Sequence, residues 1–217
     1  MRAQEFCSRH GLDWYAIRNS GQIFTDPPEM TEAQLWHFFD MDTDYKAIEQ
    51  ELSQFEKLKP VLPGAGVTPA LRILRQQFVP CVVSFIISAN NNIKRFSKTI
   101  AQIDFDHLDR YTEQDFVRFG CGYRAPYLVK SIAQLRTMDA VKLGALPNEN
   151  LRKQLLTLSG VGPKVADCIM LFAFHRLDVA PVDTWIKRVQ DKIPTHPYAG
   201  VAQQYLFYYL QHLHKGL

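Results

Sequence analysis

Residues 158–168 read Leu-Ser-Gly-Val-Gly-Pro-Lys-Val-Ala-Asp-Cys, and this string is the most informative part of the 217-residue chain. A helical pattern over residues 148–156 leads into the tight Gly-x-Gly turn. A second helix is predicted from Pro163, because proline is favoured at the first position of a helix. Two glycines leave bare backbone amides at a helix N-terminus, where a phosphate group can sit close. The string therefore predicts two helices joined by a phosphate-binding turn.

This arrangement is typical of a helix-hairpin-helix. Contacts to phosphate position a protein on DNA and carry no sequence information, so such a hairpin grips a DNA backbone without reading its bases. Gly-x-Gly alone is more often an ordinary tight turn between two helices. Only the complete string favours the DNA-binding interpretation.

Lys164 falls in the first turn of the second helix, where the helix dipole and partial burial both disfavour a cation. A lysine placed there can present the neutral amine that a Schiff-base nucleophile requires. A phosphate-contacting or solvated lysine is the simpler alternative. Cys168 lies four residues further on, shares a helix face with Lys164 and is by default a small core residue.

A carboxylate follows about twenty residues later, in the segment Pro181-Val182-Asp183. Asp183 precedes a helical pattern over residues 184–192 and suits the N-cap of that helix. Capping does not exclude a second role. A carboxylate held near Lys164 can stabilise positive charge developing on a sugar ring, or help to move protons.

The remaining sequence predicts a mainly α-helical chain. Helical patterns cover residues 31–39, 44–57, 68–78, 80–88, 93–103, 113–119, 125–135, 148–156, 163–174, 184–192 and 199–213. Residues 14–24 instead predict a β-hairpin, with Trp14–Arg18 and Gln22–Phe24 as its strands. We therefore expect a short α+β N-terminal piece over residues 1–60, native or truncated, followed by an α-helical bundle over residues 61–217.

Composition limits the class of protein. With 47% hydrophobic and 22% charged residues, the chain suits one globular unit or two small lobes. It has neither the roughly 20-residue apolar run of a membrane helix nor the apolar run of a signal peptide near its start. Its four cysteines (Cys7, Cys81, Cys121, Cys168) stand far apart, which argues against structural zinc or iron–sulfur clusters and for a reducing compartment. We expect neither a secreted nor a membrane protein.

Charge is unevenly distributed. Residues 1–60 contain 6 lysines and arginines against 11 aspartates and glutamates, and the remaining residues contain 19 against 11. The larger, basic part can therefore meet a polyanion while the acidic part faces elsewhere. Chance variation on solvated faces explains the asymmetry equally well.

At this point the sequence resembles a known family. Gly-Val-Gly-x-Lys-Val-Ala-Asp-Cys followed by Pro-Val-Asp resembles the helix-hairpin-helix DNA glycosylases, and within them the 8-oxoguanine DNA glycosylases. Three further segments resemble that family in the same order: Phe85–Arg95 (its Ser-x-Asn-Asn-Asn-Ile-x-Arg), Phe119–Ala125 (its Leu-Gly-x-Gly-Tyr-Arg-Ala) and Pro197–Phe207 (its Pro-Tyr-Ala-Gly-x-Ala-Gln). The match extends from about Leu35 to the C-terminus.

The resemblance implies roles in catalysis. Lys164 would attack C1′ of the damaged nucleotide and form the Schiff base, and Asp183 would stabilise the transition state. Cys168 and Phe207 would sandwich the extruded base, while Gln203 would hydrogen-bond its Watson–Crick edge. The fold implied is a helix-hairpin-helix DNA glycosylase bundle, with residues 61–217 as its catalytic part and residues 1–60 as a reduced N-terminal domain.

The resemblance also implies DNA contacts. Tyr123 would wedge into the base stack beside the vacated position, and the amides of Gly160 and Gly162 would bind a phosphate. The gap and the orphaned cytosine would be held by Asn90, Arg95 and Arg124. No metal site or required cofactor is expected, although hairpin carbonyls would suit a monovalent cation. The expected partner is double-stranded DNA containing 8-oxoguanine.

The sequence departs from the family at two places. Only 38 residues precede Phe39, and Ser20-Gly21-Gln22, which is similar to the family's lesion-sensing Ser-Gly-Gln, is explained equally well by a hairpin turn. Trp185 stands where the family often has a histidine. The family's lesion-sensing role is therefore not assigned to Gly21.

We expect a bifunctional DNA glycosylase/AP lyase that excises 8-oxoguanine opposite cytosine and cleaves the strand by β-elimination. Two alternatives stay open: a glycosylase of the same fold for another lesion, and a module that binds damaged or abasic DNA without cutting it. The protein is expected to be a monomer that works with DNA inside the cell, in bacterial cytoplasm or a eukaryotic nucleus.

Overall fold

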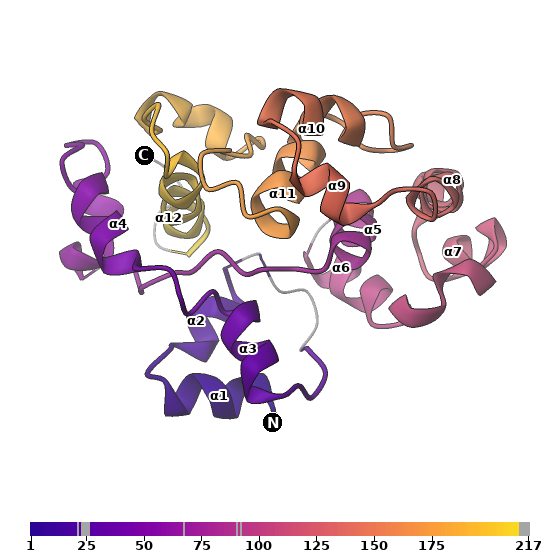
Figure 1. Cartoon of the computed structure of the whole chain (residues 1–217), viewed down its shortest axis with the longest axis horizontal. Coiled ribbons are helices and arrows are strands. Elements are labelled where there is room, and N and C mark those ends of the chain that lie inside the picture. Colours follow the sequence, from indigo (N-terminus) through magenta and orange to yellow (C-terminus); the bar gives the residue numbers. More distant parts are fainter. Residues whose placement is uncertain (21, 23–26, 67, 90, 92, 213–217) are drawn as a thin grey trace. The chain divides into compact units, whose positions relative to one another are not determined.

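The computed structural model describes residues 1–217 apart from 21, 23–26, 67, 90, 92 and 213–217 (Figure 1). Every regular element of the described residues is a helix, which confirms the mainly α-helical class. The chain forms two compact units, residues 1–75 with 175–217 (the N/C unit) and residues 76–174 (the central unit). The sequence-based domain boundary at residue 60 stays a prediction. Among the described helices, none combines the length and the apolar character that spanning a membrane requires.

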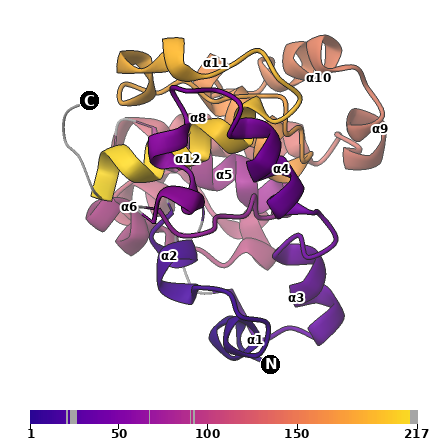
Figure 2. The same cartoon turned by 90° about the vertical axis from the view of Figure 1, so that its left-hand side faces the viewer.

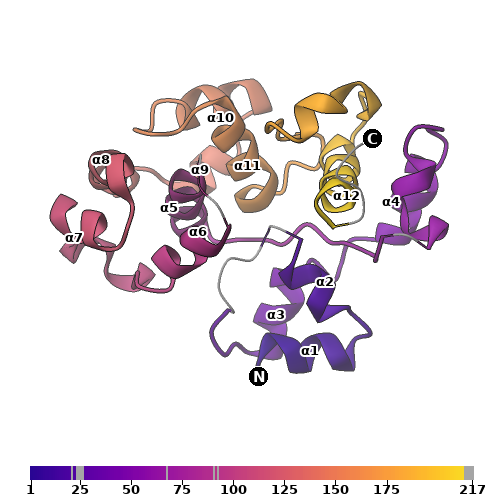
Figure 3. The same ribbon diagram turned by 180° about the vertical axis from the view of Figure 1, so that it is seen from behind.

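The central unit is built around two apolar helices, α5 and α11, which pack against each other (Figures 1 and 3). Burial of Val82 to Ile87 in α5 and of Val165 to Phe172 in α11 forms its core. Helix α5 also packs against α6 and α8, while α10 packs against α11. The elements are α5 (Phe78–Ser88), α6 (Ile93–Ile100), η3 (Phe105–Arg110), α7 (Glu113–Arg118), η4 (Gly122–Arg124), α8 (Ala125–Leu135), α9 (Ala140–Gly144), α10 (Asn148–Leu155) and α11 (Pro163–Ala173).

The N/C unit brings the two ends of the sequence into one fold (Figure 2). Its N-terminal helices share a core cluster in which Phe6 stacks on Phe39, with ring centroids 5.4 Å apart. The predicted helix at residue 31 is confirmed, because Thr31 forms a capping box with Gln34. The elements are α1 (Ala3–Arg9), α2 (Trp14–Arg18), α3 (Glu32–Phe38), α4 (Tyr45–Leu52), η1 (Lys59–Val61), η2 (Pro63–Ala65), η5 (Ile186–Arg188), η6 (Gln190–Lys192) and α12 (Ala199–His212).

The predicted N-terminal β-hairpin is wrong over residues 14–18, which form helix α2. The Asp13 side chain accepts a hydrogen bond from the Ala16 amide at 2.9 Å, and Ile17 is buried in the cluster around Phe6. The N-cap and this tertiary burial override the strand preference of aromatic and β-branched residues. Gly21 and residues 23–26 of the predicted hairpin lie outside the described residues.

The predicted helix over residues 68–78 is also wrong, since helix α5 begins only at Phe78 and the preceding segment is not helical. Distant side chains bond its backbone in place of helical partners. The Ile73 amide donates to the Tyr45 hydroxyl (2.8 Å), and the Leu74 amide donates to the Gln22 side-chain oxygen (2.9 Å). Gln22 also donates to the Arg72 carbonyl at 2.8 Å. Buried backbone amides and carbonyls need hydrogen-bond partners. In this non-helical segment, distant side chains supply them.

The remaining predicted helices are mostly confirmed. Residues 184–192 differ, because they form two 3₁₀ turns, η5 and η6, and bury only Ile186 and Val189. Helix α4 ends at Leu52 rather than at residue 57. Two short helices, α1 and α9, were not predicted.

Candidate active site and DNA interface

The predicted hairpin joins α10 to α11 in the central unit. Gly160 has φ +81°, a conformation that side-chain-bearing residues rarely adopt. A Cβ atom at Gly160 would lie 2.9 Å from Cβ of Tyr127 and 3.3 Å from a methyl group of Ile86. Gly162 is extended, and a Cβ atom there would meet nothing within 4 Å. Both the backbone conformation and the close packing therefore favour glycine at position 160, whereas position 162 has room for a side chain.

Helix α8 holds the hairpin through two polar side chains. Ser131 donates a hydrogen bond to the Ser159 carbonyl. Gln134 donates to the Thr157 carbonyl at 3.0 Å and accepts from the Ser159 amide at 3.0 Å. These three bonds fix the hairpin backbone from outside the hairpin itself. Sequence reasoning missed both residues, because nothing in the pattern of α8 shows what its polar positions face.

The hairpin presents unused donors. Within the described residues, the backbone amides of Gly160, Gly162 and Lys164 donate to no acceptor. They lie at the start of α11, where the helix dipole favours an anion. The arrangement can accept a phosphate group without any side-chain charge.

Lys164 is the second residue of α11 and is half-buried. Its Nζ lies 5.3 Å from the centroid of the Phe85 ring, which belongs to α5. Phe85 in turn stacks on Phe172, with centroids 5.5 Å apart and planes 8° from parallel. The aromatic pair forms an apolar floor under the amine and orients it. Phe85 begins the Phe85–Arg95 motif, from which no role for it was predicted.

Cys168 lies one turn along α11 from Lys164 and is buried, with 3% of its surface exposed. Cys81 of α5 is a second buried thiol, whose pKa is raised by burial and further by Cys168. A thiol in such surroundings stays protonated and unreactive. Among the described residues, no group of three or more His, Cys, Asp or Glu side chains is arranged to hold a metal ion.

The predicted wedge residue is presented to solvent. Tyr123 lies in η4 with 58% of its surface exposed, and the Arg124 guanidinium lies 4.4 Å from its ring centroid. Arg124 itself is only 5% exposed and donates from Nε to the Ala89 carbonyl at 2.8 Å. In this structure the Arg124 guanidinium packs against the Tyr123 ring. To contact a cytosine, Arg124 would have to give up its hydrogen bond to the Ala89 carbonyl.

Arg95 is exposed and donates to the Gly120 carbonyl at 3.1 Å, which places it beside the same loop as Tyr123. Asn90, the third residue predicted to hold the orphaned cytosine, lies outside the described residues. The central unit thus brings together Arg95, Tyr123 and Arg124 around one loop.

Asp183 belongs to the N/C unit and is half-buried. Its Oδ1 accepts hydrogen bonds from the amides of Trp185 (3.0 Å) and Ile186 (2.8 Å). Asp183 thus bonds backbone amides as a cap does, but no helix over residues 184–192 follows it, and the N-cap position of the 3₁₀ turn η5 is Trp185. Within the described residues, Oδ2 has no hydrogen-bond partner, so one carboxylate oxygen stays available.

Gln203 and Phe207 lie one turn apart on α12 of the N/C unit. Gln203 is 3% exposed, and its side-chain oxygen accepts a hydrogen bond from Gln204 at 2.6 Å. Phe207 is half-buried. Two of the three residues predicted to hold the base thus lie on one helix, whereas the third, Cys168, belongs to the central unit.

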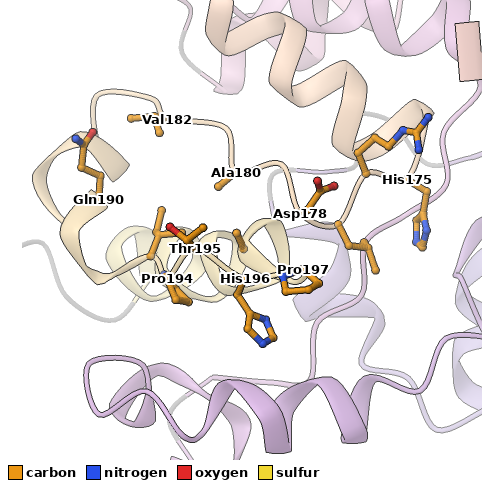
Figure 4. A pocket seen from close by; sticks show the side chains of 13 residues that line it. His175, Asp178, Ala180, Val182, Gln190, Pro194, Thr195, His196 and Pro197 are labelled. Atoms are coloured by element: carbon orange, nitrogen blue, oxygen red, sulfur yellow. The ribbon is translucent and has the colours of Figure 1, made fainter. Parts of the chain in front are cut away.

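An open pocket of about 920 Å³ lies in the N/C unit (Figure 4). The segment with Asp178, Ala180 and Val182 borders one side, and residues 193–197 border another. None of the sequence-predicted site residues lines it, although Val182 directly precedes Asp183. Its lining mixes proline and aliphatic groups with polar side chains, among them Asp178, Thr195 and His196.

Comparison with known proteins agrees with this architecture. The sequence matches no family model. The chain is 31% identical to a probable N-glycosylase/DNA lyase of Methanothermobacter thermautotrophicus, over 83% of this chain and 71% of that protein. It is 29% identical to the N-glycosylase/DNA lyase OGG1 of Arabidopsis thaliana over 75% of this chain, and spans about half (51%) of the length of that relative.

A solved structure is similar over nearly the whole chain. It is the Clostridium acetobutylicum 8-oxoguanine glycosylase/lyase in complex with double-stranded DNA containing cytosine opposite 8-oxoguanine. The TM-score is 0.80 at 28% identity, over 92% of this chain and 91% of that one. The chain is therefore a helix-hairpin-helix DNA glycosylase, as its hairpin, the lysine that follows it and the similarity to the Clostridium structure indicate. The chain belongs to the N-glycosylase/DNA lyase family.

Proposed function

We propose that the protein is a bifunctional DNA glycosylase that excises 8-oxoguanine opposite cytosine and then cleaves the strand as an AP lyase. The observation that carries this proposal is Lys164, an amine held over the Phe85 ring directly after a hairpin with unused amides. The relatives named N-glycosylase/DNA lyase and the Clostridium complex support the same substrate and reaction.

Lys164 acts as the nucleophile. Its neutral amine attacks C1′, the N-glycosidic bond breaks, and the base leaves with the bonding electron pair and takes up a proton. Opening of the sugar ring gives an imine between Nζ and C1′. Loss of a C2′ proton then expels the 3′ phosphate by β-elimination. The reaction needs no cofactor, because the lysine itself supplies the nucleophile.

Asp183 supplies negative charge to this reaction. Its Oδ1 is committed to capping, which fixes the carboxylate, and Oδ2 is left to stabilise positive charge on the sugar. A fixed carboxylate costs little reorganisation when the charge develops. Asp183→Asn would keep the cap and lose the charge.

The damaged base must leave the duplex before Lys164 can reach C1′, at a cost of a few kcal/mol. Tyr123 fills the stack beside the vacated position, and Arg95, Arg124 and Asn90 hold the opposing cytosine. The base itself is held by Cys168, Gln203 and Phe207. The amides of Gly160 and Gly162 bind the phosphate backbone.

A monovalent cation at the hairpin carbonyls belongs to the same proposal. The Leu158 carbonyl accepts one hydrogen bond, from the Val161 amide, and the Ser159 carbonyl accepts one from the Ser131 hydroxyl. Each carbonyl has a second lone pair, and neutral oxygens suit a singly charged ion. The protein would work as a monomer on chromosomal DNA inside the cell.

A cleavage assay tests the substrate. Labelled duplexes would carry 8-oxoguanine opposite each of the four bases, with undamaged guanine and an abasic site as references. The proposal predicts cleavage of 8-oxoguanine duplex, fastest opposite cytosine. Cleavage of the abasic duplex alone would show lyase chemistry with the wrong lesion, and cleavage of none would favour a module that only binds damaged DNA.

A further inference from the structure

Helix α8 connects the two proposed DNA-contacting parts of the central unit. It follows directly on η4, which carries Tyr123, and it holds the hairpin through Ser131 and Gln134. Positions 127, 131 and 134 are spaced along one helix face. The first of them, Tyr127, therefore lies between the wedge and the hairpin.

Tyr127 contacts both neighbours. Its ring meets the Tyr123 ring edge to face, with centroids 6.5 Å apart and planes 82° from parallel. Its Cβ is packed so closely against Gly160 that a side chain there would collide with it. The Cβ of Tyr127 thus lies against the hairpin backbone, and its ring lies beside the ring of Tyr123.

The rest of Tyr127 is open to solvent. Its exposed fraction is 42%, and its hydroxyl has no hydrogen-bond partner within the described residues. Single exposed aromatic residues are common and need no explanation. Two adjoining exposed tyrosines beside unused backbone amides form a surface with apolar rings and neutral donors, which suits a sugar–phosphate chain.

We propose that Tyr127 is a further DNA-contacting residue. Its hydroxyl donates to a phosphate oxygen of the strand that the hairpin grips, and its ring packs against the adjoining sugar. This inference rests on the proposed function, since it requires Tyr123 and the hairpin to bind the same DNA.

The contact has a distinctive thermodynamic signature. A phenol carries no charge, so it releases no counterion when it binds phosphate. Losing it weakens binding without changing how affinity depends on salt. A disordered hairpin would instead lower the melting temperature, which thermal unfolding measures.

Two substitutions separate contact from packing. Tyr127→Phe keeps the ring against Gly160 and removes only the hydroxyl, whereas Tyr127→Ala removes both. Tyr15→Phe is the matched control, because Tyr15 is 75% exposed on α2 and belongs to the N/C unit. Affinity would be measured by fluorescence anisotropy on duplex with a tetrahydrofuran abasic analogue, at several salt concentrations, beside thermal unfolding.

Tyr127→Phe is expected to weaken binding about tenfold, the usual effect of one hydrogen bond to a charged group, with an unchanged salt slope and melting temperature. Tyr127→Ala should weaken it further, and Tyr15→Phe should match the wild type. Tyr127→Phe binding within twofold of the wild type would overturn the proposal, whatever Tyr127→Ala does. If the wild type cleaves 8-oxoguanine duplex and Tyr127→Phe binds DNA as the wild type does, this inference alone is refuted. If the wild type neither cleaves that duplex nor binds the abasic duplex more tightly than undamaged DNA, the proposed function is refuted as well.

Discussion

Replacing Asp40 by asparagine should destabilise the N/C unit. Asp40 is 1% exposed and accepts three side-chain hydrogen bonds, each at 2.8 Å, from Arg75, Tyr45 and His175. Arg75 and His175 stand at the two points where the chain passes between the units. One buried carboxylate therefore anchors both connections to the N/C unit.

The expected loss is about 3–5 kcal/mol at pH 7, the cost of leaving a buried ion pair without one partner. Asparagine has nearly the same shape, so no cavity adds to this figure. For a protein of this size each kcal/mol lowers the melting temperature by about 2–4 °C, so a fall of about 10 °C is expected. Urea unfolding followed by circular dichroism measures the free energy directly.

The effect should depend on pH in one direction. Burial alone would raise the pKa of Asp40, but hydrogen bonds from His175, Arg75 and Tyr45 outweigh it and hold the pKa well below its usual range. A lowered pKa in the folded state contributes stability that is present above the unfolded-state pKa of about 3.9 and is lost as pH falls toward the folded-state value. The difference between wild type and Asp40→Asn should therefore shrink below about pH 4.

Asp191→Asn is the control, because this exposed aspartate also pairs with a cation (Lys57, 2.9 Å) and should change little. A loss below 1 kcal/mol for Asp40→Asn, or a difference that grows as pH falls, would refute the anchoring role.

Three further substitutions test the central unit. Gly160→Ala should lower the free energy of unfolding by about 2–4 kcal/mol, because φ +81° is strained for alanine and its Cβ would meet Tyr127 at 2.9 Å. Gly162→Ala should leave stability within about 0.5 kcal/mol in urea unfolding, since space there is open, yet weaken DNA binding in a gel-shift assay; an equal loss of stability would contradict this difference. Burial raises the pKa of Asp167 to about 6, against the opposing effect of Arg152. The wild type therefore loses stability as pH rises from about 4 to 6, and Asp167→Asn should flatten this dependence. An unchanged slope in pH-dependent thermal unfolding would sink that assignment.

The helix-hairpin-helix was predictable from sequence because its signals are local. Proline at the first helical position, two glycines and the apolar periodicity of residues 163–174 all lie within one short stretch. The structure places the hairpin, Lys164 and Cys168 where that stretch predicts them. Their roles in catalysis stay predictions.

The errors have a common physical cause. The sequence predicts a helix over residues 68–78, but side chains far away in sequence bond the amides of Ile73 and Leu74 instead. Residues 14–18 have strand-forming composition and become helical through burial against Phe6. No local pattern contains either interaction.

The supporting residues of the site were missed for the same reason. Phe85 under Lys164, and Ser131 and Gln134 against the hairpin, act through contacts between helices that are distant in sequence. The motif containing Arg124 predicts a DNA contact but not the hydrogen bond that its guanidinium donates to the Ala89 carbonyl, and the DNA contact stays a prediction.

Borohydride trapping on labelled duplex with 8-oxoguanine opposite cytosine tests most directly whether Lys164 is the nucleophile. Lys164→Gln would be compared with the wild type and with Lys153→Gln, an exposed lysine on α10 that pairs with Glu149. We expect a covalent adduct with the wild type and with Lys153→Gln, and none with Lys164→Gln, which should still bind the duplex. An adduct of undiminished yield with Lys164→Gln would contradict the assignment.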